Sequence, residues 1–285
     1  MTPSYPTADT ILRVELANGM TVLAYENHAS PSVVLAGYLW AGALSEPDEQ
    51  AGLANFTAGM LMRGTENRTF GQINQALESV GAQLGFSAGA HTVGFGGKAL
   101  AEDLDLLLDV LADSLQNPTF PADQAEKLQG QILTSLQRRA HDTRRMAALA
   151  FNALLYPDHP YGRSVQGYED TIAGLGRGEL LGYYRDRYSP QGLVIAVVGA
   201  VAADVVVGKV RAALGDWQAP NVTPNRTIPP RVTLAESRRH PHVRLVGVHL
   251  HIGSPVYATA PYVEATSKGV ALIEHLRADG LTIEA

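Results

Sequence analysis

Five leucines at helical spacing constrain the fold of this chain more than any other feature. They recur every three or four residues and therefore share one side of a helix, which Asn117-Pro118 ends. These residues are Leu104, Leu107, Leu108, Leu111 and Leu115. The stripe predicts an amphipathic helix whose apolar face is buried in a core.

Strand-like and helix-like segments surround this helix without a strict strand–helix–strand alternation. Apolar and polar residues alternate through 11–26 on either side of Asn18-Gly19, a strong hairpin signal. Residues 82–98 are typical of a Gly-rich hairpin. Further strands are expected over 32–40 and 192–201. Further helices are expected over 48–63, 70–80, 121–139, 143–155 and 177–188, and in a segment that ends at Leu214. This mixed order predicts an α+β fold.

Composition excludes several classes of function. A chain with 46% hydrophobic and 18% charged residues can bury a sizeable core, and its net charge of -6 argues against nucleic acid as a partner. There is no cysteine, so a metal would need His, Asp or Glu. The longest apolar run, 192–203, is too short to span a membrane. We expect a soluble, bacterial protein, cytoplasmic or, if a signal peptide has been removed, periplasmic.

The chain is expected to have three parts. Residues 1–215 hold the α+β domain, 216–240 form a Pro-rich linker, and 241–285 form a tail with one strand (243–251) and one helix (261–279). The tail is too short to bury its own apolar surface, so we expect it to dock on the first domain or on a partner.

The sequence around one predicted helix points to a known family. The segment Leu39–Glu46 (LWAGALSE) precedes Gly52–Leu61 (GLANFTAGML), and later landmarks are Phe120-Pro121, the loop 156–162 (YPDHPYG) and the strand 194–199. Over about residues 12–217 the chain resembles the pitrilysin/insulinase family of zinc peptidases, whose helix carries H-x-x-E-H at this point.

The resemblance implies a zinc site whose residues have been replaced. Two His and one Glu at positions i, i+4 and i+3 share a helix face, where they hold zinc and activate water. The matching positions here are Asn55, Gly59 and Ala58, and the family's distal Glu matches Ser135. We therefore expect no zinc, no catalytic residue and no peptidase activity from the chain alone. The four positions are either ordinary helix-face residues or a small uncharged patch that accommodates a partner or peptide.

The tail shows a second resemblance. The segment 245–254 (LVGVHLHIGS) and the helix after it look like one strand–helix unit of diaminopimelate decarboxylase, a pyridoxal-phosphate (PLP) enzyme. This resemblance would place His251, Gly253 and Ser254 at a PLP site. PLP needs a Schiff-base lysine from the same barrel, and Lys98, Lys127 and Lys209 lie in no matching context. We expect no PLP binding.

The favoured function is that of a non-catalytic partner of an H-x-x-E-H subunit in peptide processing, as in proteins like mitochondrial processing peptidase. The predicted sheet presents an edge near the degenerate helix, and such an edge accepts an extended peptide by strand addition. The expected partner is an active zinc-peptidase homologue or a second copy of the chain. Two alternatives remain: a fragment of diaminopimelate decarboxylase fused to a peptidase-like domain, and an inert structural module.

Overall fold

The computed structural model describes residues 6–157, 159–219 and 260–278. The chain forms two compact units, Met1–Thr227 and Ile228–Ala285. In the second unit the described residues form one helix, α10 (Ala260–Ala278), which agrees with the predicted tail helix. The predicted strand 243–251, most of the predicted linker, and His251, Gly253 and Ser254 lie outside the described residues.

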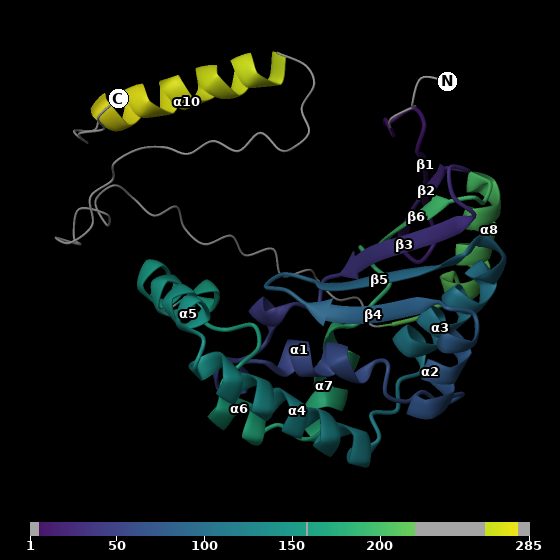
Figure 1. The fold of residues 1–285 in the computed structure, drawn as a ribbon, viewed down its shortest axis with the longest axis horizontal. Helices are drawn as coiled ribbons and strands as arrows, with labels where there is room; N and C mark the ends of the chain where they lie inside the picture. The colour runs from purple at the N-terminus through teal and green to yellow at the C-terminus, as the bar shows by residue number, and fades with distance from the viewer. Residues whose placement is uncertain (1–5, 158, 220–259, 279–285) are drawn as a thin grey trace. The chain divides into compact units, whose positions relative to one another are not determined.

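The first unit is built on one six-stranded sheet (Figure 1). Its strands are β1 (Leu12–Glu15), β2 (Thr21–Glu26), β3 (Ser32–Leu39), β4 (Gln83–Ala88), β5 (Val93–Leu100) and β6 (Val194–Gly199). Their order in the sheet is β1-β2-β6-β3-β5-β4. β2 pairs with β6 in parallel, and every other pair is antiparallel. This mixed sheet with its helices confirms the α+β prediction.

Both predicted hairpins are present. β1 and β2 pair around Asn18-Gly19, where Gly19 has a φ of 83°, a left-handed conformation that glycine adopts without strain. β4 and β5 pair in register from Gln83 opposite Lys98 to Ala88 opposite Val93. The second hairpin places β4 at one edge of the sheet.

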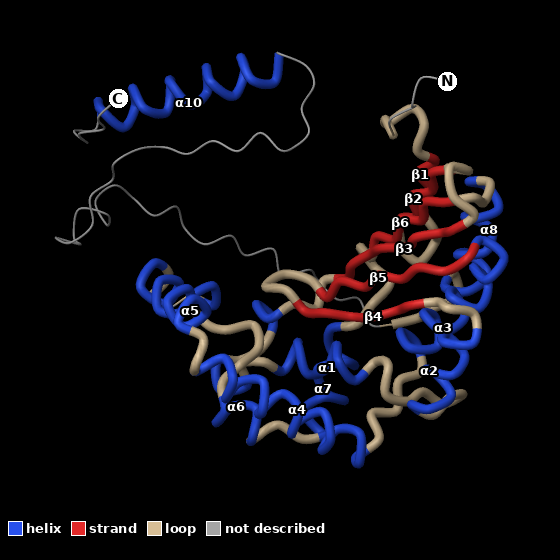
Figure 2. Tube along the Cα trace, viewed as in Figure 1, coloured by secondary structure: helices blue, strands red, loops and turns tan. Residues whose placement is uncertain are grey.

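Helices cover one face of the sheet in two tiers, and one further helix, α5, lies beyond the end of the sheet (Figure 2). They are α1 (Leu53–Met60), α2 (Phe70–Ser79), α3 (Leu104–Gln116), α4 (Ala122–Ala140), α5 (Thr143–Leu155), α6 (Glu169–Ala173), α7 (Arg177–Arg187) and α8 (Ala203–Leu214). Short 3₁₀ turns are η1 (Ala43–Ser45), η2 (Asp48–Gln50), η3 (Ala101–Asp103) and η4 (Pro160–Gly162). α1, α2, α3 and α8 pack on strands, while α4 and α7 pack on α1.

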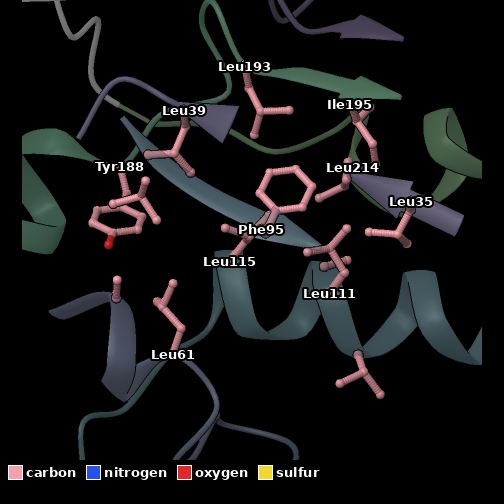
Figure 3. Close-up of a cluster of buried hydrophobic side chains, with 14 of the residues drawn as sticks. Leu35, Leu39, Leu61, Phe95, Leu111, Leu115, Tyr188, Leu193, Ile195 and Leu214 are labelled. Atoms are coloured by element: carbon pink, nitrogen blue, oxygen red, sulfur yellow. The ribbon is translucent and has the colours of Figure 1, made fainter. Parts of the chain in front are cut away.

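The core confirms the prediction that the leucine stripe is the buried face of an amphipathic helix, α3. The five leucines of the stripe are buried in α3, and they pack with inward side chains of β3, β5 and β6 such as Leu35, Phe95 and Ile195 (Figure 3). On the opposite face of β3, Val34 and Tyr38 are exposed. The sheet therefore buries one face under helices, as the alternation along its strands requires.

The predicted helix over 48–63 is wrong in length. The structure has a 3₁₀ turn, η2, followed by α1, which begins only at Leu53 and ends at Met60. Gly52 separates them because its φ of 99° cannot continue a right-handed helix. Gly64, the residue just after the predicted helix, lies four residues past the end of α1 and bridges to Thr69. The helix α6 was also missed.

Within the described ranges, the helices lack the combination of length and hydropathy that crossing a bilayer requires.

We predict that Gly52→Ala destabilises the first unit by about 2–4 kcal/mol. A Cβ at this position would have a strained positive φ and would lie 2.7 Å from Ile172 Cδ1 and 2.9 Å from Gly167 Cα. Gly208→Ala is the matched control, because a Cβ there meets nothing within 4 Å on the exposed side of α8. It should stabilise the chain by about 0.5–1 kcal/mol. Urea denaturation of both variants measures the difference, and equal effects would contradict the prediction.

Candidate functional site at the first turn of helix α1

The four positions that match the zinc site lie on two packed helices. Asn55, Ala58 and Gly59 are on α1, and Ser135 is on α4, which packs against α1. Asn55 and Gly59 are half-buried, whereas Ala58 is buried with 1% of its surface exposed. Ser135 is exposed.

Leu128 of α4 fills the space beside Gly59. A Cβ built on Gly59 would lie 3.0 Å from Leu128 Cδ2, a tight contact that leaves no room for an imidazole without movement of the leucine. Ser135 follows Leu128 by seven residues, two helical turns, and so lies on the same side of α4. The structure thus brings the α1 and α4 positions onto facing surfaces.

The donors at these positions do not fit zinc. An Asn amide is a weak ligand, Ala and Gly offer no side-chain donor, and a serine hydroxyl replaces a carboxylate. In the ranges that the structure describes, no group of three or more His, Asp or Glu residues is arranged to hold a metal ion. We derive no metal-dependent step for this chain.

A buried carboxylate that the sequence analysis missed holds the start of α1. Gly52, the N-cap residue, has no side chain to accept the N–H groups of the first turn. Glu46 accepts them instead: its Oε1 receives the Gly52 N–H at 2.9 Å and its Oε2 receives the Ala54 N–H at 2.7 Å. Glu46 is only 5% exposed, so its carboxyl group caps the helix from a desolvated position, where the helix macrodipole favours the ionised form and burial opposes it.

Arg163 joins the same segment to the loop before α6. Its Nη2 donates to the carbonyl oxygens of Ala43, at 2.6 Å, and of Glu46, at 2.8 Å, and its Nη1 pairs with Asp48. Tyr183 of α7 donates its hydroxyl to the carbonyl oxygens of Ala41 and Gly42. The residues that lead into α1 are therefore held from two other parts of the chain.

The surroundings of Glu46 change its acidity. Burial raises the pKa of Glu46 to about 7, and this effect outweighs the two backbone hydrogen bonds and the nearby Arg163, which lower it. Burial is also the main reason that the pKa of the Tyr183 hydroxyl is raised, with the charge of Glu46 as the next cause. Tyr183 therefore stays neutral and acts as a hydrogen-bond donor.

The edge strand β4 lies beside α1, as the sequence analysis predicted. Exposed and half-buried residues alternate along it, and no further strand pairs with its outer side among the described residues. Gly85 of β4 and Gly94 and Gly96 of β5 leave a shallow hollow of about 390 Å³ on the sheet surface. Unpaired backbone groups at such an edge can pair with an extended peptide.

The lysines considered for PLP lie on three different elements. Lys98 is on β5, Lys127 of α4 pairs with Asp123, and Lys209 of α8 pairs with Asp105. Since His251 and Ser254 are outside the described residues, the absence of a PLP site remains a prediction.

We predict that Glu46 makes the stability of the chain depend on pH between about 4.5 and 7. The folded chain holds this proton more tightly than the unfolded chain, so ionisation costs stability and the free energy of unfolding falls as pH rises through this range. At about 1.4 kcal/mol per pKa unit, the loss is at most about 3.5 kcal/mol. Glu46→Gln, which keeps only one acceptor, should be less stable than the original chain at pH 5, with the gap narrowing or reversing at pH 8.

Urea denaturation across this pH range measures the effect. Glu49→Gln is the control, because Glu49 is an exposed carboxylate of η2 whose replacement should leave the profile unchanged. Parallel profiles for the original chain and Glu46→Gln would contradict the prediction.

Two family models match the chain. The model described as insulinase (peptidase family M16) matches residues 21–167, and the model described as peptidase M16 inactive domain matches residues 174–281. The second match runs through the tail that resembled diaminopimelate decarboxylase. The comparisons do not support that resemblance.

Curated relatives point to the same family. An uncharacterized zinc protease of Mycobacterium leprae is 31% identical over 72% of this chain and 46% of its own length, and one of Mycobacterium tuberculosis is 30% identical over 82% and 53%. A probable mitochondrial-processing peptidase subunit beta of Arabidopsis thaliana is 28% identical over 69% of this chain and 37% of its own length. The chain spans about half the length of the curated relatives that it matches.

Solved structures agree on the fold. A peptidase M16 inactive domain from Pseudomonas fluorescens superposes with a TM-score of 0.68 at 24% identity, covering 75% of this chain and 52% of that one. The periplasmic protease PqqL of Escherichia coli gives a TM-score of 0.71 at 19% identity, covering 78% and 26%. With the insulinase model matching residues 21–167, just over half of the sequence, the chain belongs to the insulinase family of peptidases, family M16.

Proposed function

We propose that this chain is a non-catalytic member of the insulinase family that pairs with an H-x-x-E-H homologue and helps it to hold an extended peptide. One observation carries the proposal. The chain has the family's helix α1, yet Asn55, Ala58, Gly59 and Ser135 supply neither zinc donors nor a base.

The structure around α1 supports a role that depends on shape. Glu46, Arg163 and Tyr183 fix the start of α1, and the edge of β4 lies beside it. An edge beside a helix without charged site residues suits a neutral peptide backbone.

The partner role is favoured by the kind of relatives that match. The Arabidopsis relative is described as a subunit, and the matching regions of the zinc proteases extend over about half of their length. An active homologue would provide the zinc chemistry that this chain lacks. No cofactor is proposed, neither zinc nor PLP.

We predict that the chain as it stands holds no stoichiometric zinc and that restoring the donors creates a site. The variant carries Asn55→His, Ala58→Glu, Gly59→His and Ser135→Glu, together with Leu128→Ala to clear the space beside position 59. It should retain about one zinc per chain after dialysis against free metal.

Metal analysis and calorimetric titration measure this gain. The same variant with Leu128 retained is the matched control and should bind zinc more weakly, since the leucine lies 3.0 Å from the added Cβ. Tight zinc binding by the unmodified chain would contradict the proposal, and no gain in the variant would mean that these four positions do not form one site.

We predict that the chain associates with an H-x-x-E-H homologue encoded in the same genome and changes its rate of peptide cleavage. The contacts would be backbone and apolar, so association should change little between about 0.1 M and 1 M NaCl. Sedimentation velocity and a peptidase assay at both salt concentrations measure this.

Gln83→Lys with Ser87→Lys tests the β4 edge, because lysines blunt strand pairing. Both residues are exposed on β4. The control is Thr10→Lys with Leu12→Lys, which adds the same charge at the opposite edge of the sheet, where Leu12 begins β1 and Thr10 lies just before it. If the chain stays monomeric and leaves the rate unchanged, it is an inert module. If both double variants behave alike, the β4 edge is not the peptide site.

A further inference from the structure

A cavity of about 520 Å³ lies near α5, η4 and the segment that leads into α1. Ala90, in the turn between β4 and β5, also lines it, and in Figure 1 this turn points toward α5. We call this space the arginine cavity, because three of its lining residues are Arg139, Arg145 and Arg163. None of the described residues that line it is Asp or Glu.

Arg139 is the most unusual of the three. It is 8% exposed, and the described residues place no carboxylate within salt-bridge distance of it. Its guanidinium donates to Ser164 Oγ at 2.7 Å, to the Gly167 carbonyl oxygen at 3.0 Å and to Gln166 Oε1 at 3.5 Å. These bonds use Nη1 and Nη2 and leave two of its five N–H groups for another acceptor.

A buried charge without an ionic partner is costly. Removing a guanidinium from water costs free energy, and neutral acceptors recover only part of it. A carboxylate brought beside Arg139 would make charge-assisted hydrogen bonds in a site where water competes poorly.

The carboxylates near the other arginines lie outside the cavity lining. Arg163 pairs with Asp48, which is mostly exposed, and Arg145 pairs with Asp142 at 3.3 Å. Glu46 uses both oxygens on the backbone of α1. Glu169 of α6 acts on Arg139 only at longer range. The positive charge that faces the cavity is thus only partly balanced.

The cavity also has apolar walls and a defined relation to β4. Leu44, Leu149 and Val165 line it, which suits the methylene stem of a side chain. The Leu44 N–H donates to the Ala90 carbonyl oxygen at 2.8 Å, so the cavity begins just past the end of β4 at Ala88. A strand that paired with β4 and continued past Ala88 would bring its next residues to this opening.

We propose that the arginine cavity is a subsite for a carboxylate side chain of an extended peptide bound along β4. This inference rests on the proposed peptide-binding function and adds the chemistry that selects the peptide: a Glu or Asp positioned just beyond the stretch that pairs with β4, its carboxylate directed to Arg139 and Arg145.

The test measures binding of labelled peptides to the 285-residue chain by fluorescence anisotropy. The peptides have about ten Ser, Thr and Val residues, enough to pair with β4 and continue past it, and both ends are blocked. One Glu is moved through the positions in turn, and each peptide has a Gln twin. A further peptide carries a free C-terminal carboxylate in place of Glu, which distinguishes a side chain from a chain end.

At one position near an end of the peptide, we expect Glu to bind about tenfold more tightly than Gln. Arg145→Gln should remove most of that preference. Arg144→Gln is the matched control, because Arg144 is exposed on the same helix, does not line the cavity and carries the same charge. The preference should also weaken at high salt.

The outcomes separate this inference from the function on which it rests. Peptides that bind equally with Glu and Gln at every position, or a preference that Arg145→Gln leaves intact, overturn the subsite but not the peptide-binding function. Tighter binding of the free C-terminal carboxylate than of every Glu peptide overturns the side-chain assignment. No binding by any peptide overturns both proposals. A Glu preference that the β4 lysine variant does not affect supports the subsite and overturns pairing with β4.

Discussion

The pair of hydrogen bonds from the first turn of α1 to Glu46 is the interaction on which the rest of the candidate site depends. Gly52 allows the chain to turn into α1 with a positive φ but cannot cap the helix. Glu46 accepts both N–H groups from a buried position, and Arg163 fixes the backbone around Glu46 from more than a hundred residues away. The position of α1, and with it the relation of α1 to β4 and α4, follows from this arrangement.

Much of the fold could be predicted from the sequence because its signals are local. Asn18-Gly19 specifies a hairpin within a few residues, and the leucines of α3 repeat within one helix. The start of α1 could not be predicted in this way, because its cap lies six residues before Gly52 rather than at the N-cap position itself. A single Glu after an otherwise apolar run, shortly before a glycine, was the available signal for Glu46.

In the candidate site, too, features set by local sequence could be predicted and features set by the tertiary fold could not. Asn55, Ala58 and Gly59 could be matched to H-x-x-E-H from sequence because one helix imposes their spacing, and Ser135 could be matched through the family resemblance. That these four positions form one degenerate zinc site remains a prediction. The arginine cavity could not be predicted from sequence, since α4, α5, η4 and the β4–β5 turn contribute to it and only the tertiary fold brings them together. Nor could the position of the Leu128 side chain beside Gly59, which depends on the packing of two helices with no sequence pattern in common.

The way in which α1 is held has a consequence for how such a chain can change over time. All the hydrogen bonds that Glu46 makes to α1 are at its first turn, and Arg163 and Tyr183 hold the segment before it. Gly59 lies near the other end, where its neighbour is the flexible side chain of Leu128. Replacements at the half-buried positions 55 and 59 therefore leave the hydrogen bonds at the start of α1 in place, whereas replacements at 46, 52 or 163 remove them or the turn that they hold. The start of α1 and its Gly59 end thus answer to different neighbours, so substitutions toward the end of this short helix can accumulate while Glu46 continues to hold its beginning.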